Sequence, residues 1–133
     1  MRRLFVDSFY FLALLNPGDA AHTWAVEFAE DFDGQFVTAT SILIDVADAL
    51  SHPSLRHLFS QLSVEIAANS NIVVVALDDE LYTAGSQLYR TRPDKDWSLT
   101  DCISFVVMRR EGITEALTGD HDFEQAGFVA LLK

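Results

Sequence analysis

The chain has 133 residues, half of them hydrophobic and only 3 of them proline. This composition predicts one folded domain over residues 1–133 and excludes a disordered or collagen-like chain. Acidic residues outnumber basic ones by 20 to 9, which gives a net charge of −11. That balance argues against broad nucleic-acid binding and against docking on anionic membranes, since both need a basic face. An acidic chain can still act on a phosphate when a metal cation stands between them.

The single cysteine and the N-terminus indicate a cytoplasmic protein. Cys102 alone can form neither an intrachain disulfide nor a CxxC zinc motif, and it is expected to be a buried structural thiol. The N-terminal apolar run is broken by Asp7 and Ser8 and has no small-residue cleavage site, so no signal peptide is predicted. No apolar stretch of about 18 residues occurs, so no membrane span is predicted either.

Apolar patterning predicts alternating strands and helices. In chain order we expect a strand at 4–6, helices at 9–15 and 22–32, a strand at 35–38, helices at 41–50 and 54–69, and a strand at 72–77. A helix at 79–89, a polar loop at 91–97, a helix at 98–110 stopped by Gly112, a strand at 113–117, a short helix and a strand at 128–132 follow. This order predicts a three-layer α/β/α fold with a mostly parallel five-stranded sheet.

Carboxylates follow two of the predicted strands. Ligands of an open parallel sheet bind beyond the carboxyl ends of its strands. Asp7 comes directly after the first strand, and Asp120 and Asp122 come shortly after the fourth. If these two strands are neighbours, Asp7 and Asp120 face one pocket.

Two helical acids are further candidates. Asp45 lies in an otherwise apolar helix, where Ile42 three residues earlier is expected to aim it toward the core side. Asp101 closes a capping box with Ser98, a structural role that stands beside the metal-binding one. Asp48 is expected on the solvated face.

Several carboxylates in one pocket repel each other unless a cation is present. Oxygen ligands without cysteine favour Mg²⁺ or Mn²⁺ over zinc. Such an ion binds substrate phosphates and activates a water.

Other polar and aromatic residues have structural interpretations. The pair Asp78-Asp79 is expected to begin a helix, and His121 to face solvent. Trp24 and Trp97 are expected to pack helices onto the sheet. Five of the 9 basic residues fall between positions 90 and 110, where they either present local positive charge or pair with nearby acids.

Four segments resemble motifs of the PIN-domain family, in the right order and over nearly the whole chain. They are residues 5–9 (FVDSF), residues 37–50 with Asp45, residues 98–105 (SLTDCISF) and residues 116–128 (ALTGDHDFEQAGF). The compact size is similar to that of VapC-type toxins.

The resemblance implies a strand order of 3-2-1-4-5 and a metal-dependent ribonuclease. It implies an acidic quartet of Asp7, Asp45, Asp101 and Asp120, with the ion on Asp7, Asp101 and Asp120. Ser8 and Thr118 would orient ligands or waters, and Asp122 would assist. With RNA as the implied substrate, the candidates for RNA contact are Arg90, Arg92 and Lys95. It also implies a small antitoxin that lies across an apolar groove with a basic residue in the acidic pocket, and a homodimer, with Trp24, Phe28, Phe9 and Phe11 as candidate surface residues.

One departure from the family pattern keeps an alternative open. The family most often has Glu where this chain has Asp45, which predicts either contact through a water or a weaker metal site. A catalytically weak PIN-like binding module is therefore the alternative to the enzyme. A phosphatase or phospho-acceptor, suggested by Asp78-Asp79 and Asp120-His121-Asp122, would need its acid pair after the first strand and a late lysine, where the chain has only Lys133.

Overall fold

The computed structural model describes residues 1–132, so Lys133 lies outside the described residues. Five strands pair in parallel in the order β3-β2-β1-β4-β5. They are β1 (Arg2–Val6), β2 (Gly34–Ala39), β3 (Ile72–Val75), β4 (Glu115–Leu117) and β5 (Val129–Ala130). The predicted strand order is confirmed, and β1 and β4 are neighbours.

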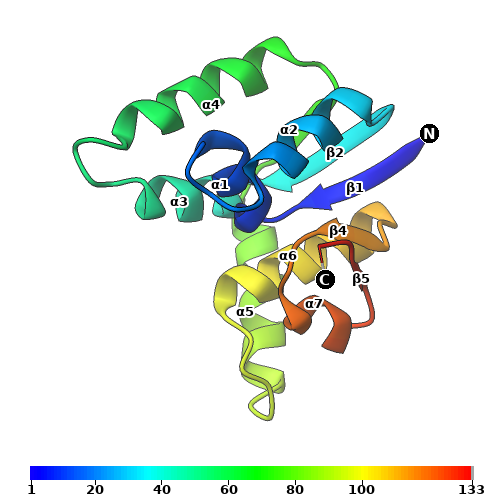
Figure 1. Ribbon diagram of the computed structural model, residues 1–133. Coiled ribbons are helices and arrows are strands. Elements are labelled where there is room, and N and C mark those ends of the chain that lie inside the picture. The colour runs from blue at the N-terminus through cyan, green and yellow to red at the C-terminus, as the bar shows by residue number, and fades with distance from the viewer. Residues whose placement is uncertain (133) are drawn as a thin grey trace.

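Helices cover both faces of the sheet. They are α1 (Ser8–Leu15), α2 (His22–Asp31), α3 (Thr40–Ala49), α4 (Arg56–Ala68), α5 (Asp79–Thr91), α6 (Leu99–Glu111) and α7 (His121–Gln125). Figure 1 shows α1, α2 and α4 on one side of the strands and α5, α6 and α7 on the other. The three-layer prediction is therefore confirmed. Helix α3 contacts both α1 and α6, so it bridges the two layers.

The central position of β1 in the sheet explains why its sequence is apolar without alternation. Leu4, Phe5 and Val6 are all buried, because each face of the strand meets a helical layer. Val6 lines a hollow beneath α1 and α4. Phe5 faces the other layer, where its ring lies 6.4 Å from that of Phe123 in α7.

The last two strands are shorter than predicted. Gly112 ends α6 in the left-handed conformation (φ +68°), and the Ile113 N–H still bonds back to Met108, so β4 begins only at Glu115. In β5 the ladder covers two residues. Leu131 continues to donate to β4 at Ala116, but in a turn conformation that ends the strand.

The aromatic predictions are partly wrong. Trp97 is buried as expected, but Trp24 is 40% exposed and stacks on Phe28 of the same helix at 5.1 Å. Residues four apart on a helix are neighbours on its surface, so the Trp24 ring packs against Phe28 without entering the core. Phe11 is buried, whereas Phe9 is exposed. None of the helices within residues 1–132 has the length and apolar character that crossing a membrane requires.

Candidate functional site

The carboxyl ends of β1 and β4 lie side by side, and acidic residues follow both. Val6 of β1 pairs with Leu117 of β4, so Asp7 and Thr118 leave the sheet next to each other. The Asp7 N–H donates to the Leu117 carbonyl at 3.4 Å, and the Thr118 hydroxyl donates to Asp7 Oδ2 at 2.7 Å. This is the adjacency that the predicted pocket requires.

Asp7 is a buried carboxylate whose charge is only partly balanced. Burial raises the pKa of Asp7 above its ordinary value, and the negative charges of Asp120 and Asp45 raise it further. The hydrogen bonds from Thr118 and from the backbone N–H of Ser8 act in the opposite direction. Ser8 thus supports Asp7 through its backbone.

Asp101 belongs both to a helix cap and to the acidic site. It donates its N–H to Ser98 Oγ at 3.0 Å, and its Oδ2 accepts from the Ser98 N–H at 3.1 Å, which confirms the capping box. Burial and the charges of Asp120, Asp7 and Asp122 nevertheless raise the pKa of Asp101 to about 7. A side-chain interaction with Asp101 lowers the pKa of Asp122, against the effect of burial.

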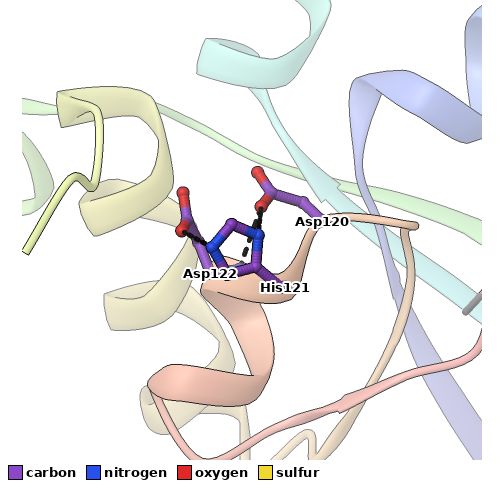
Figure 2. Close-up of side chains that lie close together, drawn as sticks. All are labelled: Asp120, His121 and Asp122. Atoms are coloured by element: carbon purple, nitrogen blue, oxygen red, sulfur yellow. Dashed lines mark hydrogen bonds and ion pairs between the residues drawn. The ribbon is translucent and has the colours of Figure 1, made fainter.

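Asp120, His121 and Asp122 form a compact group at the start of α7, with one ligand atom from each within 4.8 Å of the others. Figure 2 shows the His121 ring between the two carboxylates, with Nδ1 3.8 Å from Asp120 Oδ1 and Nε2 3.5 Å from Asp122 Oδ1. Asp122 is only 8% exposed, and its Oδ1 has no hydrogen-bond partner among the described residues. Burial, followed by the charge of Asp120, raises the pKa of Asp122.

The prediction that Asp45 points toward the core is wrong. Its side chain is exposed, and the buried face of α3 is formed by Ile42 and Val46. Ile44 is also exposed, so the apolar run around Asp45 does not mark an inward face. Asp45 still lies close enough to Asp7 for its charge to raise the pKa of Asp7. Asp48 is exposed, as predicted.

The edge therefore gathers Asp7, Asp101, Asp120 and Asp122, with Asp45 at its outer side. Within residues 1–132, none of these acids is paired with a lysine or arginine. Raised carboxyl pKa values and a buried carboxylate oxygen without a hydrogen bond fit a site built around a cation. Oxygen donors of this kind fit Mg²⁺ or Mn²⁺.

Sequence reasoning did not predict that His121 would lie close to both neighbouring carboxylates. His121 faces solvent as expected, yet it reaches both neighbouring carboxylates. The signal was the acidic residue on either side of it, directly after a strand and at the start of a short helix.

The five basic residues between positions 90 and 110 divide into two groups. Arg90, Arg92 and Lys95 line one cleft at the connection between α5 and α6. Arg109 and Arg110 lie at the other end of α6, where Arg110 pairs with Glu80 at 3.7 Å.

Two structural predictions are also confirmed. Asp78 caps the start of α5 by accepting from the Leu81 N–H at 2.8 Å, and Cys102 is a buried thiol.

Comparisons with known proteins include one relative of nearly the same length, which matches both by its sequence and by its solved structure. The 23S rRNA-specific endonuclease VapC20 of Mycobacterium tuberculosis is 28% identical over 126 residues, which are 95% of each chain. The crystal structure of VapC20, described as a sarcin–ricin loop cleaving toxin, has a TM-score of 0.84 at 26% identity and covers 96% of this chain and 98% of that chain. No family model matches the chain.

VapBC2 from Rickettsia felis, solved with a DNA fragment from its promoter, has a TM-score of 0.67 at 11% identity over 96% of each chain. This second likeness supports the fold alone. The strand order and the likeness to these structures define a PIN-like α/β protein. Within that class, the chain is similar to the VapC-type PIN-domain toxins, and the resemblance carried by its four sequence motifs is confirmed.

Proposed function

We propose that the protein is a divalent-metal-dependent endoribonuclease that serves as the toxin of a cytoplasmic toxin–antitoxin pair. The observation that carries the proposal is the convergence of four carboxylates, three with raised pKa values, at the carboxyl edge of β1 and β4. The likeness to VapC20, an endonuclease of 23S rRNA, supports RNA as the substrate.

In this proposal Asp7, Asp101 and Asp120 hold one Mg²⁺ or Mn²⁺ ion, and Asp45 and Asp122 assist. When bound, such an ion lowers the pKa of a water and offsets negative charge on the scissile phosphate. Asp45 is exposed at the outer side of the edge, where an acid one methylene shorter than Glu suits contact through a water.

The chain's own residues fix these carboxylates before substrate arrives. Thr118 donates to Asp7, and the Ser98 N–H donates to Asp101. Asp120 Oδ1 accepts from the Asp122 N–H at 2.9 Å, which sets the orientation of its side chain. Preorganised ligands avoid the cost of ordering them during the reaction.

This protein has a groove of the kind that the proposed antitoxin would occupy. A hollow of about 350 Å³ lies between α1, α2 and α4, lined by apolar side chains that include Tyr10, Phe11 and Leu62. An apolar segment would fill it, and a basic side chain further along would enter the acidic edge. We also propose a homodimer, with exposed Phe9 and Trp24 available to either surface; Phe11 is buried and contributes only from within the hollow.

A PIN-like binding module without useful activity is the second candidate. The exposed position of Asp45, together with its shorter side chain, is the observation that favours it. The two candidates differ in whether RNA is cut in the presence of the ion.

A cleavage assay separates them. Purified protein is incubated with Mn²⁺ and a hairpin that carries the sarcin–ricin loop, the target of VapC20. We expect cleavage that EDTA abolishes and that Asp7→Asn and Asp101→Asn slow by on the order of a hundredfold or more. Asp48→Asn, which changes an exposed acid of α3, is expected to cleave normally.

The result that contradicts the proposal is equal cleavage by wild type and Asp7→Asn, which would reveal a contaminating nuclease. Folded wild-type protein that cuts neither this hairpin nor total RNA would instead support the binding module. Circular dichroism of each variant shows whether the fold is retained.

A further inference from the structure

Positive charge gathers beside the acidic edge, although the molecule as a whole is strongly acidic. A cleft of about 320 Å³ lies between the end of α5 and the start of α6. Its lining includes Arg90, Arg92, Lys95, Trp97 and Cys102. This volume is at the small end of the range for ligand pockets and suits a single nucleotide.

Two observations place the cleft against the acidic site. Cys102 in its lining directly follows Asp101 in the chain. Trp97 Nε1 donates to Gln125 Oε1 of α7 at 3.1 Å, which ties the loop to the helix that carries Asp122. An RNA strand that occupies the acidic edge therefore continues naturally into the cleft.

Arg92 is fixed in a way that leaves one face of its guanidinium group available. It donates from Nε to Asp94 Oδ1 at 3.1 Å and from its terminal nitrogen to Asp94 Oδ2 at 3.2 Å. Both bonds lie in the plane of the fork. One face of the group covers the Trp97 ring, 5.1 Å from its centroid. The Arg92 side chain is 41% exposed, so the group keeps accessible surface for a base. Guanidinium planes are stacking surfaces for unpaired bases in RNA recognition.

The other two cations are available for phosphate. Arg90 is exposed and has no acidic partner among the described residues. Lys95 is 3.9 Å from Asp94, a carboxylate that Arg92 already engages with both oxygens. Asp96 also lines the cleft, so its three cations still exceed the two nearby acids, Asp94 and Asp96.

We propose that this cleft binds one unpaired nucleotide next to the scissile phosphate, with its base on the outer face of Arg92 and its phosphate on Arg90 and Lys95. The inference rests on the proposed ribonuclease function and adds a substrate class to it. A base within a continuous duplex cannot leave its stack without breaking a pair, so the cleft selects single-stranded or looped RNA.

The test measures binding and cleavage separately. Binding of a fluorescein-labelled, unstructured RNA oligonucleotide is followed by anisotropy in EDTA, where metal-dependent cleavage cannot occur. Arg90→Ala and Lys95→Ala are each expected to weaken binding by about threefold to tenfold and to reduce the salt slope by about 0.7. Arg92→Lys keeps the charge but loses the flat face, and we expect at least about a fivefold loss.

Arg109→Ala is the matched control. Arg109 is an exposed, unpaired arginine within residues 1–132, and it lies at the far end of α6 beside Glu111, which pairs with Arg3 at the amino end of β1. Its loss changes the net charge as much as Arg90→Ala does, which makes the two variants comparable. Because Arg109 lies away from the cleft, we expect binding to change by less than about twofold. With Mn²⁺, the cleft variants are expected to raise KM for a hairpin cut in its loop more than they lower kcat.

The proposal is overturned if the cleft variants bind RNA like Arg109→Ala, or if Arg92→Lys binds like wild type. Normal cleavage in that case leaves the ribonuclease function in place. Conversely, absence of cleavage by wild type with a selective loss of binding in the cleft variants would overturn the enzyme and leave the nucleotide site.

Discussion

At the scale of single residues, Asp7 depends on the hydroxyl of Thr118. That hydroxyl is the side-chain donor to a buried carboxylate, 2.7 Å from Oδ2, and it counteracts the effect of burial on the Asp7 pKa. Hydrogen bonds to charged groups contribute more than those between neutral groups.

Thr118→Val therefore has a specific expected result. It preserves the shape of the side chain but removes the donor, so we expect a loss of about 1–3 kcal/mol in the free energy of unfolding and weaker Mn²⁺ binding at pH 7. Urea denaturation and calorimetric titration measure the two effects. Thr38→Val is the control, because Thr38 is equally buried but donates to the backbone carbonyl of Val6. Equal loss of Mn²⁺ affinity in both variants would contradict the role of Thr118.

Asp101 makes stability depend on pH in a predictable direction. Its pKa is raised from 3.8 to about 7 in the folded protein, mainly by burial. The folded state then binds more protons than the unfolded state, so the stability that this group contributes is complete below pH 3.8 and is lost as the pH rises to about 7.

Asp101→Asn isolates this effect in metal-free protein, because Asn resembles the protonated acid. We expect the variant to match wild type at pH 4 and to exceed it by on the order of 1–2 kcal/mol at pH 8, after allowance for solvent screening. Denaturation at several pH values in EDTA measures the difference. Asp48→Asn should show no such trend, and a constant difference for Asp101→Asn would contradict the assigned cause.

At the scale of elements, the close packing of α5 on α6 holds the cleft and Asp101 in register. Gly85 of α5 faces Ile103 of α6, and a Cβ at Gly85 would lie 2.5 Å from Ile103 Cγ1 and 3.2 Å from the Ile103 backbone Cα. No side chain larger than hydrogen fits without moving the helices apart.

Gly85→Ala is therefore expected to destabilise the protein by about 1–3 kcal/mol, although alanine is the better helix former. Urea denaturation of this variant is compared with that of Gln87→Ala, an exposed position on the same helix. We expect little change for Gln87→Ala. A more stable Gly85→Ala variant would show that the two helices can separate without cost.

The elements also show how far sequence reasoning reaches. Strands with continuous apolar sequence and helices with clear caps, such as α6 after Ser98, were predicted closely. The ends of β4 and β5 were not, because they depend on how the chain leaves the helix at Gly112 and on tertiary pairing. Asp45 was misplaced for a similar reason: an apolar helix at the edge of a fold has no sequence signal for its exposed face.

At the scale of the whole molecule, the net charge of −11 is unevenly distributed. Carboxylates converge at the end of the two central strands, and the cations of the cleft lie beside them. The sequence predicted which acids follow the strands, but only the strand order brings positions 7 and 120 together. An acidic protein arranged in this way is expected to engage RNA weakly without a metal ion and to do so mainly through the cleft.

The central claim is that the acidic edge is a site for a divalent cation, and calorimetric titration with Mn²⁺ tests it most directly. Wild-type protein at pH 8 is predicted to bind one ion, with binding lost or greatly weakened in Asp7→Asn and Asp120→Asn and retained in Asp48→Asn. Undiminished Mn²⁺ binding by folded Asp7→Asn and Asp120→Asn would contradict the claim.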